Sequence, residues 1–355
     1  MPRAIVADEM GGFRFVEYDL PEPHGDEVRI RVEFAAPKHG TEMHALRGSA
    51  FDRKRWDPEL RLFLPREADE SGDTAPSGSR SIGNMIVGTI EQGGPDARRF
   101  KTGDRVFGYG PIREVHQASE AALWPVGGLT DPDCVCEDPA HVAFVAVRDG
   151  NIRIGDTVAV YGLGAIGLMA VQIARVGGAR KVYAVDPITL RRDRAMALGA
   201  DAALDPSSCD AGLEIKRATG GAGVDVSIET SGSGAALHDA IRCIRQCGIV
   251  VHVGWGPHDC SALHLDEEFH LNRPTIVGSQ AWSGWGCADR SYPLWTHERA
   301  FEATIELFRA GLITGNMVVE PIVSVNKAPW ALAAMVHAPH TTVKLGVEFG
   351  EGVER

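Results

Sequence analysis

A glycine motif is the part of this sequence best suited to chemistry. Gly162, Gly164 and Gly167 form the pattern Gly-x-Gly-x-x-Gly directly after a run of β-prone residues, and a helical pattern begins at once. In such a motif the first glycine allows a tight turn, the second lets the backbone approach a pyrophosphate, and the third lets helix and strand pack closely. The free N–H groups at the start of the helix, including those of Ala165 and Ile166, would then face the phosphates.

An acidic residue follows the motif at a telling distance. Asp186 ends the next β-prone segment, 181–185, about 20 residues past the last glycine. There a carboxylate can hold both ribose hydroxyls of NAD, and it would repel the 2′-phosphate of NADP. A glycine motif alone is weak evidence and also fits a turn in some other α/β protein. Strand, glycines, helix, strand and acid in this order indicate a dinucleotide-binding Rossmann unit.

The segments around this motif predict an α/β fold with a doubly wound parallel sheet. Strand patterns at 223–230, 248–253 and 275–277 follow the motif, and a helical pattern at 235–244 lies between the first two. Alternation of this kind implies a parallel sheet with helices on both faces. Before the motif the chain is β-rich, since residues 27–34 alternate polar and apolar side chains.

Three further segments complete the organisation. Residues 51–80 are charged and then rich in serine, glycine and proline. They predict a long surface loop, either a lid over the site or an insertion without a role. An amphipathic helix is expected from about residue 296, followed by strands at 321–325 and 343–349.

Composition excludes several classes of function. The chain has 355 residues, enough for two domains, and its 44% hydrophobic content and 41 glycines suit a globular α/β enzyme. A formal net charge of −12 argues against a nucleic-acid surface. The N-terminus has no signal-peptide pattern, and no apolar run is long enough to span a membrane. The seven cysteines contain no Cys-x-x-Cys pair, so we expect reduced thiols and a cytoplasmic protein.

Short motifs give the chain a resemblance to the medium-chain dehydrogenase/reductase family, in its branch of zinc alcohol, sorbitol and sugar dehydrogenases. Residues 100–106 (Phe-Lys-Thr-Gly-Asp-Arg-Val) resemble a strand-leading motif of the catalytic domain, and residues 155–158 resemble the motif before the glycine turn. Gly83 and Gly88 resemble the frame of the family's Gly-His-Glu element. The order of these parts matches over essentially the whole chain.

The resemblance implies a Rossmann domain inserted in a β-rich, GroES-like catalytic domain. The first part of the catalytic domain would span residues 1–150, the NAD-binding domain residues 151–295, and the return to the catalytic domain residues 296–355. The family also implies a homodimer or a homotetramer.

The family's zinc ligands are altered in this chain. Where the zinc enzymes have Cys-Gly-Thr-Asp the sequence has His39-Gly-Thr-Glu, and where they have Gly-His-Glu it has Gly-Asn84-Met. The third ligand position is Asp138, with Glu137 one residue away, and the four-cysteine lobe for structural zinc is absent. The amide of Asn84 cannot replace an imidazole, so this set predicts catalysis without zinc. A retained zinc would take His39 and Asp138 as ligands.

The resemblance also implies a site for proton transfer. Thr41 and His44 stand two and five residues after His39, as the hydroxyl and the histidine of the relay do in zinc alcohol dehydrogenases. Thr41 would hydrogen-bond the substrate hydroxyl, and His44 would pass the proton outward. His39 or Asp138 would act as general base, with Asn84 beside them at the reacting carbon. The alternatives are a solvated loop histidine at 44 and a vestigial metal ligand at 39.

Further cofactor contacts are implied by the same resemblance. Arg191, five residues after the acid, matches a basic residue that reaches the adenosine ribose in NAD-dependent members. Thr230, Val253 and Gly254 follow two later strands, at the carboxyl edge where the nicotinamide should lie. Lys344 matches a basic residue near the pyrophosphate.

These features predict an NAD(H)-dependent oxidoreductase that acts on a secondary alcohol, or the corresponding ketone, of a sugar, polyol or cyclitol. A redox-neutral epimerase or eliminase, working through a transient ketone with bound NAD, stays open. A catalytically inactive NAD-binding sensor also stays open, although the retained Thr41 and His44 weigh against it. Zinc-free quinone and enoyl reductases normally use NADPH, and Asp186 argues against that reaction.

Overall fold

The computed structural model describes residues 1–8, 12–38, 40, 54–65, 80–255, 259–281 and 295–350. By packing, the chain divides into two compact units. Unit 1 comprises Met1–Arg47, Pro65–Cys136 and Val318–Arg355, and unit 2 comprises Gly48–Leu64 and Glu137–Met317. Both ends of the sequence therefore belong to unit 1. The domain limits expected at residues 150 and 295 stay a prediction.

Unit 1 is built from β-sheets. A mixed sheet has the strand order β10-β8-β7-β3-β18-β17, with β9 also paired to β3. Its strands are β3 (Glu27–Ala36), β7 (Met85–Gly93), β8 (Arg105–Tyr109), β9 (Val115–Ser119), β10 (Leu123–Pro125), β17 (Val319–Ser324) and β18 (Lys344–Glu348). An antiparallel sheet of order β2-β1-β6 joins β1 (Arg3–Ala7), β2 (Phe13–Glu17) and β6 (Arg80–Ser81).

The core of unit 1 follows from the alternation in β3. Val28, Ile30, Val32 and Phe34 are buried on one face, as the sequence pattern predicts. They belong to a cluster that also includes residues of α11 (Ala328–His337), whose apolar side covers the sheet. The remaining helices are η1 (Glu120–Ala122), α3 (Asp131–Val135), η3 (Val325–Lys327) and η4 (Pro339–Thr341).

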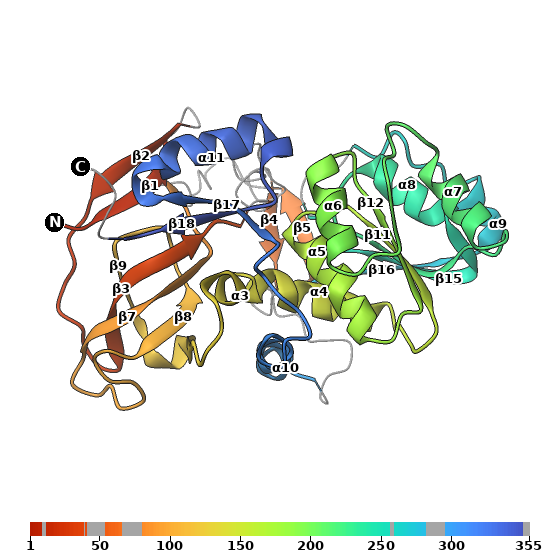
Figure 1. Ribbon diagram of the computed structural model, residues 1–355. Coiled ribbons are helices and arrows are strands. Elements are labelled where there is room, and N and C mark those ends of the chain that lie inside the picture. Colours follow the sequence, from red (N-terminus) through yellow and green to blue (C-terminus); the bar gives the residue numbers. More distant parts are fainter. Residues whose placement is uncertain are drawn as a thin grey trace. The chain divides into compact units, whose positions relative to one another are not determined.

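Unit 2 contains the doubly wound sheet, which confirms the α/β class (Figure 1). The strand order is β13-β12-β11-β14-β15-β16, and each printed neighbour pair is parallel. The strands are β11 (Thr157–Tyr161), β12 (Lys181–Val185), β13 (Ala202–Leu204), β14 (Val224–Glu229), β15 (Ile244–His252) and β16 (Thr275–Gly278). In chain order this is 3-2-1-4-5-6, the Rossmann arrangement, and the order reverses between β11 and β14.

Helices connect these strands. They are α5 (Ala165–Val176), α6 (Thr189–Ala197), α7 (Ala211–Ala218), α8 (Gly234–Arg242) and α9 (Glu268–Asn272). Right-handed crossovers place α5 and α6 on one face of the sheet and α7 and α8 on the other. Two more helices, α4 (Glu137–Asp149) and α10 (His297–Arg309), also belong to unit 2. Within the described residues, no helix combines the length and apolar character needed to cross a bilayer.

The surface loop expected over residues 51–80 is wrong for its described part. Residues 54–65 contain the paired strands β4 (Lys54–Asp57) and β5 (Leu62–Pro65). The rings of Trp56 and Phe63 meet edge to face with centroids 5.1 Å apart, and this contact joins the two strands. The segments 51–53 and 66–79 lie outside the described residues.

Candidate active site

The glycine motif forms the turn between β11 and α5. Gly162 has φ +82°, and a Cβ there would lie 2.8 Å from the backbone nitrogen of Ser231. A Cβ at Gly167 would lie 1.8 Å from the carbonyl oxygen of Gly162, so close packing of helix on turn requires glycine. A Cβ at Gly164 would meet nothing within 4 Å. No protein contact requires glycine at 164, which fits a ligand that approaches this backbone.

The start of α5 offers backbone donors to such a ligand. Gly164 is the N-cap residue of the helix and makes no side-chain capping bond. The first N–H groups of the helix, at Ala165 and Ile166, have no partner inside the helix itself. The free N–H groups and the positive end of the helix dipole together favour an anion at this turn.

Asp186 is tied into the same turn. Its side chain is 3% exposed. One carboxylate oxygen accepts the backbone N–H of Leu163 at 2.7 Å, and the other accepts the N–H of Ile188 at 2.8 Å. The guanidinium of Arg191 lies 3.8 Å from the first oxygen. Burial lowers the pKa of Arg191, and the charge of Asp186 opposes that effect. The structure therefore brings the predicted acid and the predicted base together beside the glycine turn.

A second loop, after β14, meets the glycine turn. The hydroxyl of Thr230 donates to the carbonyl of Gly162 at 2.7 Å. A Cβ at Gly254, after β15, would lie 2.4 Å from the Cα of Gly232. The N–H of Val253 donates to the carbonyl of Glu229 at 2.8 Å. The loops after β11, β14 and β15 are thus packed on one another at the carboxyl edge, where the strand order reverses and Rossmann folds bind ligands.

Glu229 and His252 are site residues that the sequence analysis missed. Glu229 is fully buried, and its Oε1 accepts the N–H groups of Ser231 at 2.6 Å and of Gly232 at 3.0 Å. Its Oε2 lies 3.0 Å from Nδ1 of His252. An acid at the end of an otherwise apolar strand, directly before Thr-Ser-Gly, is the signal that could have found it. Glu229 holds the loop after β14 in place.

The predicted catalytic residues fall in three places. His39, Thr41 and His44 lie outside the described residues. Asn84 belongs to unit 1, where its backbone N–H donates to the carbonyl of Ala36 at 3.0 Å. Asp138 belongs to unit 2, in the first turn of α4, and is buried.

The segment that leads to His39 is braced within unit 1. The ammonium group of Lys344 is 3% exposed and donates to the carbonyl of Pro37 at 3.0 Å. Gly83, with φ +140°, lies so close to Pro111 that a Cβ would approach its Cα to 2.5 Å. Residues 36–37, Asn84 and Lys344 are therefore set around the entry to the predicted catalytic segment. The pyrophosphate contact expected of Lys344 stays a prediction.

The two acids at the start of α4 have different surroundings. Glu137 is 1% exposed, and its Oε1 is in hydrogen-bond contact with the hydroxyl of Thr304 on α10. Burial, and then the neighbouring charge of Asp138, raise the pKa of Glu137, against which the bond from Thr304 acts. One turn on, the ring of His141 meets that of His297 with centroids 4.5 Å apart. Glu137 thus takes part in packing α10 on α4, which leaves Asp138 as the candidate for chemistry.

Comparisons with known proteins agree over the whole chain. Residues 165–291 match the protein family described as zinc-binding dehydrogenase. D-guloside 3-dehydrogenase of Escherichia coli K12 is 38% identical over 357 residues, which cover 98% of this chain and 100% of the relative.

Solved structures share the fold. That of 2R,3R-butanediol dehydrogenase from Bacillus subtilis aligns with a TM-score of 0.75 at 22% identity, covering 99% of this chain and 100% of the other. Galactitol-1-phosphate dehydrogenase from Escherichia coli aligns with a TM-score of 0.74 at 17% identity, covering 98% and 99%.

Proposed function

Because this chain belongs to the medium-chain, zinc-binding dehydrogenase family and is an oxidoreductase of that family, we propose that it oxidises a secondary alcohol of a sugar, polyol or cyclitol with NAD⁺, or reduces the corresponding ketone with NADH. The relative named D-guloside 3-dehydrogenase, alike over its full length, supports a sugar substrate. The observation that carries the cofactor is the open backbone at Gly164 beside the carboxylate of Asp186.

The residues present fit a dinucleotide. The turn Gly162–Gly167 would hold the pyrophosphate against the start of α5, and Asp186 would accept hydrogen bonds from the adenosine ribose. The loops that Glu229 and Thr230 brace would border the nicotinamide. When bound, NAD⁺ supplies an acceptor for the hydride that leaves the carbinol carbon.

The chain's own groups must then take the proton of the substrate hydroxyl. In this proposal Thr41 hydrogen-bonds that hydroxyl, and His39 or Asp138 acts as general base. His44 passes the proton to solvent. A general base can remove the hydroxyl proton without a metal to lower its pKa.

The donor set does not suit a catalytic zinc. Zinc sites in proteins are built from thiolate, imidazole and carboxylate, whereas Asn84 offers a neutral amide oxygen. With Asn84 in the second position, two conventional donors remain, His39 and Asp138, which is one fewer than the three protein ligands of a catalytic zinc site. We therefore place the acid–base work on side chains.

A substrate panel tests this proposal. Purified full-length protein, treated with a chelator and then freed of it, is assayed with NAD⁺ against sugars, their glycosides, polyols and cyclitols. We expect NADH formation with at least one of them and no increase on adding zinc. NAD binding without any turnover would instead identify a sensor. Nicotinamide retained through desalting, with substrate converted but no net NADH, would identify a redox-neutral enzyme.

The zinc arm has its own control. Bound zinc is compared between wild type and Asp138→Asn, because only zinc that depends on Asp138 bears on this site. If zinc restores activity to chelated protein and Asp138→Asn loses one bound zinc, the enzyme is a Lewis-acid dehydrogenase and this part of the proposal fails.

A further inference from the structure

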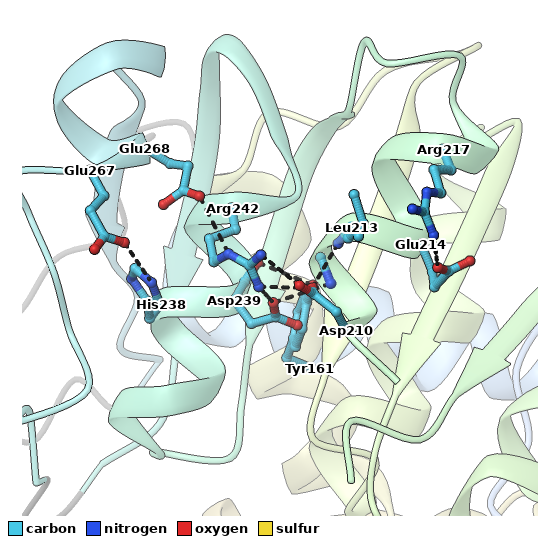
Figure 2. A network of polar contacts seen from close by, with 11 residues as sticks. Tyr161, Asp210, Leu213, Glu214, Arg217, His238, Asp239, Arg242, Glu267 and Glu268 are labelled. Atoms are coloured by element: carbon cyan, nitrogen blue, oxygen red, sulfur yellow. Dashed lines mark hydrogen bonds and ion pairs between the residues drawn. The ribbon is translucent and has the colours of Figure 1, made fainter. Parts of the chain in front are cut away.

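A histidine and two glutamates gather in unit 2, outside the three loops of the candidate active site (Figure 2). His238 lies on α8, Glu267 is the N-cap residue of α9, and Glu268 is the first residue of that helix. One donor atom from each residue lies within 4.8 Å of the donors of the other two. Imidazole nitrogen and carboxylate oxygen are the donor types that Zn²⁺ accepts.

The spacing suits two ligands of one cation better than a direct hydrogen bond. Nε2 of His238 lies 3.6 Å from Oε2 of Glu267, whereas hydrogen bonds between nitrogen and oxygen end near 3.2 Å. Two donors bound tetrahedrally to one zinc at its usual bond lengths lie about 3.4 Å apart. Closing the widest of the 4.8 Å gaps requires a modest side-chain movement, and the side chain of Glu267 is 54% exposed and free to make it.

Several donor atoms of the cluster have no protein partner. Nδ1 of His238 and Oε2 of Glu268 are both buried and lack a hydrogen-bond partner among the described residues. Glu267 occupies the N-cap position of α9 but makes no capping bond with its side chain. Buried polar atoms are normally satisfied, so unpartnered donors around one point suggest an absent ligand.

The local charge favours a cation. The guanidinium of Arg242 is close to three carboxylates at once, with nitrogen–oxygen distances of 2.8 Å to Asp210, 3.0 Å to Asp239 and 3.4 Å to Glu268. Figure 2 shows this fan of contacts beside the His238–Glu267 pair. One positive charge faces three carboxylates, and Glu267 adds a fourth, so the region carries excess negative charge. Arg242 approaches Oε1 of Glu268 and leaves Oε2 for another partner.

A second histidine stands next to the cluster. The ring of His264 meets the ring of His238 edge to face, with centroids 5.3 Å apart and an interplanar angle of 84°. His264 is exposed and lies three residues before Glu267 in the chain. It is placed to complete a four-ligand set of two imidazoles and two carboxylates.

We propose that His238, Glu267 and Glu268, with His264 as fourth ligand, form a binding site for a divalent transition-metal cation of the Zn²⁺ class. The ion fastens the short helix α9 to α8. Mg²⁺ and Ca²⁺ prefer sets made wholly of oxygen donors, so the imidazoles select against them. Arg242 holds the carboxylate of Glu268 in orientation, as groups behind metal ligands commonly do.

Calorimetry on the full-length, chelator-treated protein tests the site, with ZnCl₂ and MgCl₂ as the two titrants. We expect Zn²⁺ to bind and Mg²⁺ to give no heat. Zinc at about a hundredfold excess over its Kd should raise Tm by roughly 5–10 °C. Glu267→Gln and His238→Ala should each weaken zinc binding at least about tenfold and abolish most of the Tm shift. Glu267 is exposed, so its variant keeps the test valid if His238→Ala does not fold.

Two variants control the result. Glu214→Gln removes a carboxylate from an exposed pair with Arg217 on the neighbouring helix α7 and should leave zinc binding unchanged. Asp138→Asn should also keep this zinc, because its carboxylate is not one of the ligands. Absence of zinc binding to the wild type overturns the proposal. Binding that survives both Glu267→Gln and His238→Ala, or that disappears only in Asp138→Asn, overturns it as well.

Discussion

The carboxylate of Asp186 accepts the backbone N–H of Leu163 at 2.7 Å, which ties the end of β12 to the glycine turn after β11. Its second oxygen accepts the N–H of Ile188 at 2.8 Å. The residue proposed to accept the ribose hydroxyls is therefore also a structural part of the turn that would hold the pyrophosphate. Substitutions at 186 should change cofactor choice and stability together.

Asp186→Ala should narrow the preference for NAD⁺ over NADP⁺ and lower the free energy of unfolding. Two buried N–H groups would lose their acceptors, at about 1–3 kcal/mol each. Asp186→Asn keeps one acceptor oxygen and should have a smaller effect on both quantities. The measurements are kcat/KM with each cofactor and denaturant unfolding. Asp193→Asn, on the exposed side of α6, should change neither. A wild type that uses NADP⁺ as well as NAD⁺ would show that the cofactor assignment is wrong.

Glu229→Ala should destabilise the protein by about 3–5 kcal/mol, because it removes a buried carboxylate and leaves His252 and two N–H groups without their partner. Glu229→Gln retains the volume and one acceptor oxygen, so its loss of stability should be clearly smaller. In Glu229→Gln the Kd for NAD⁺ should rise, since the loop at Thr230–Gly232 loses part of its support. Unchanged cofactor affinity in a folded Glu229→Gln protein would argue against a positioning role.

The proton-transfer proposal predicts a graded series of kinetic losses. Thr41→Val should severely reduce turnover and leave NAD⁺ binding nearly intact, because the hydroxyl contacts substrate. His39→Ala or Asp138→Asn, whichever removes the base, should reduce the rate roughly 10²–10⁴-fold. His44→Ala should cost less, because water can replace an exit group, and added imidazole should partly restore it.

The pH dependence of the rate belongs to the same proposal. A histidine base with the usual pKa of about 6.5 must be neutral to accept the proton, so the rate of oxidation should rise between about pH 6 and 8. Kinetics at wild-type level in both Thr41→Val and His39→Ala would move the catalytic groups elsewhere.

His116 should make stability depend on pH. Burial, and then the adjacent charge of Arg113, lower the pKa of His116 to about 4, and Nε of Arg113 donates to its Nδ1 at 3.0 Å. The unfolded chain takes up a proton near pH 6.5 but the folded protein does so only near pH 4. The stabilising contribution is therefore complete above pH 6.5 and is lost as the pH falls from 6.5 toward 4.

Between pH 7 and pH 5 this effect should cost about 2 kcal/mol of unfolding free energy. His116→Asn keeps an acceptor for Arg113 but cannot be protonated, so it should lose correspondingly less over the same range. Denaturant unfolding at the two pH values measures the difference. A matched substitution of the exposed His24, His24→Asn, should leave the wild-type pH dependence in place. Equal losses in wild type and His116→Asn would rule the explanation out.

Much of unit 2 could be predicted from local patterns alone. The turn at Gly162–Gly167 needs backbone freedom that only glycine provides, and β14, α8, β15 and β16 lie within a few residues of the expected segments. These features depend on neighbours in the chain, where periodicity and turn chemistry act. The buried face of β3 was predictable for the same reason.

Contacts between distant residues required the tertiary structure. Glu229 and His252 are register partners on the parallel strands β14 and β15, and their pairing depends on a register that no local pattern encodes. The cluster of His238 with Glu267 likewise depends on how α9 packs on α8. The sequence by itself determined the Rossmann turn, its acid and the altered zinc ligands, because these depend on residue types at fixed spacing. Only the tertiary structure decided which buried charges face each other, because that depends on long-range packing.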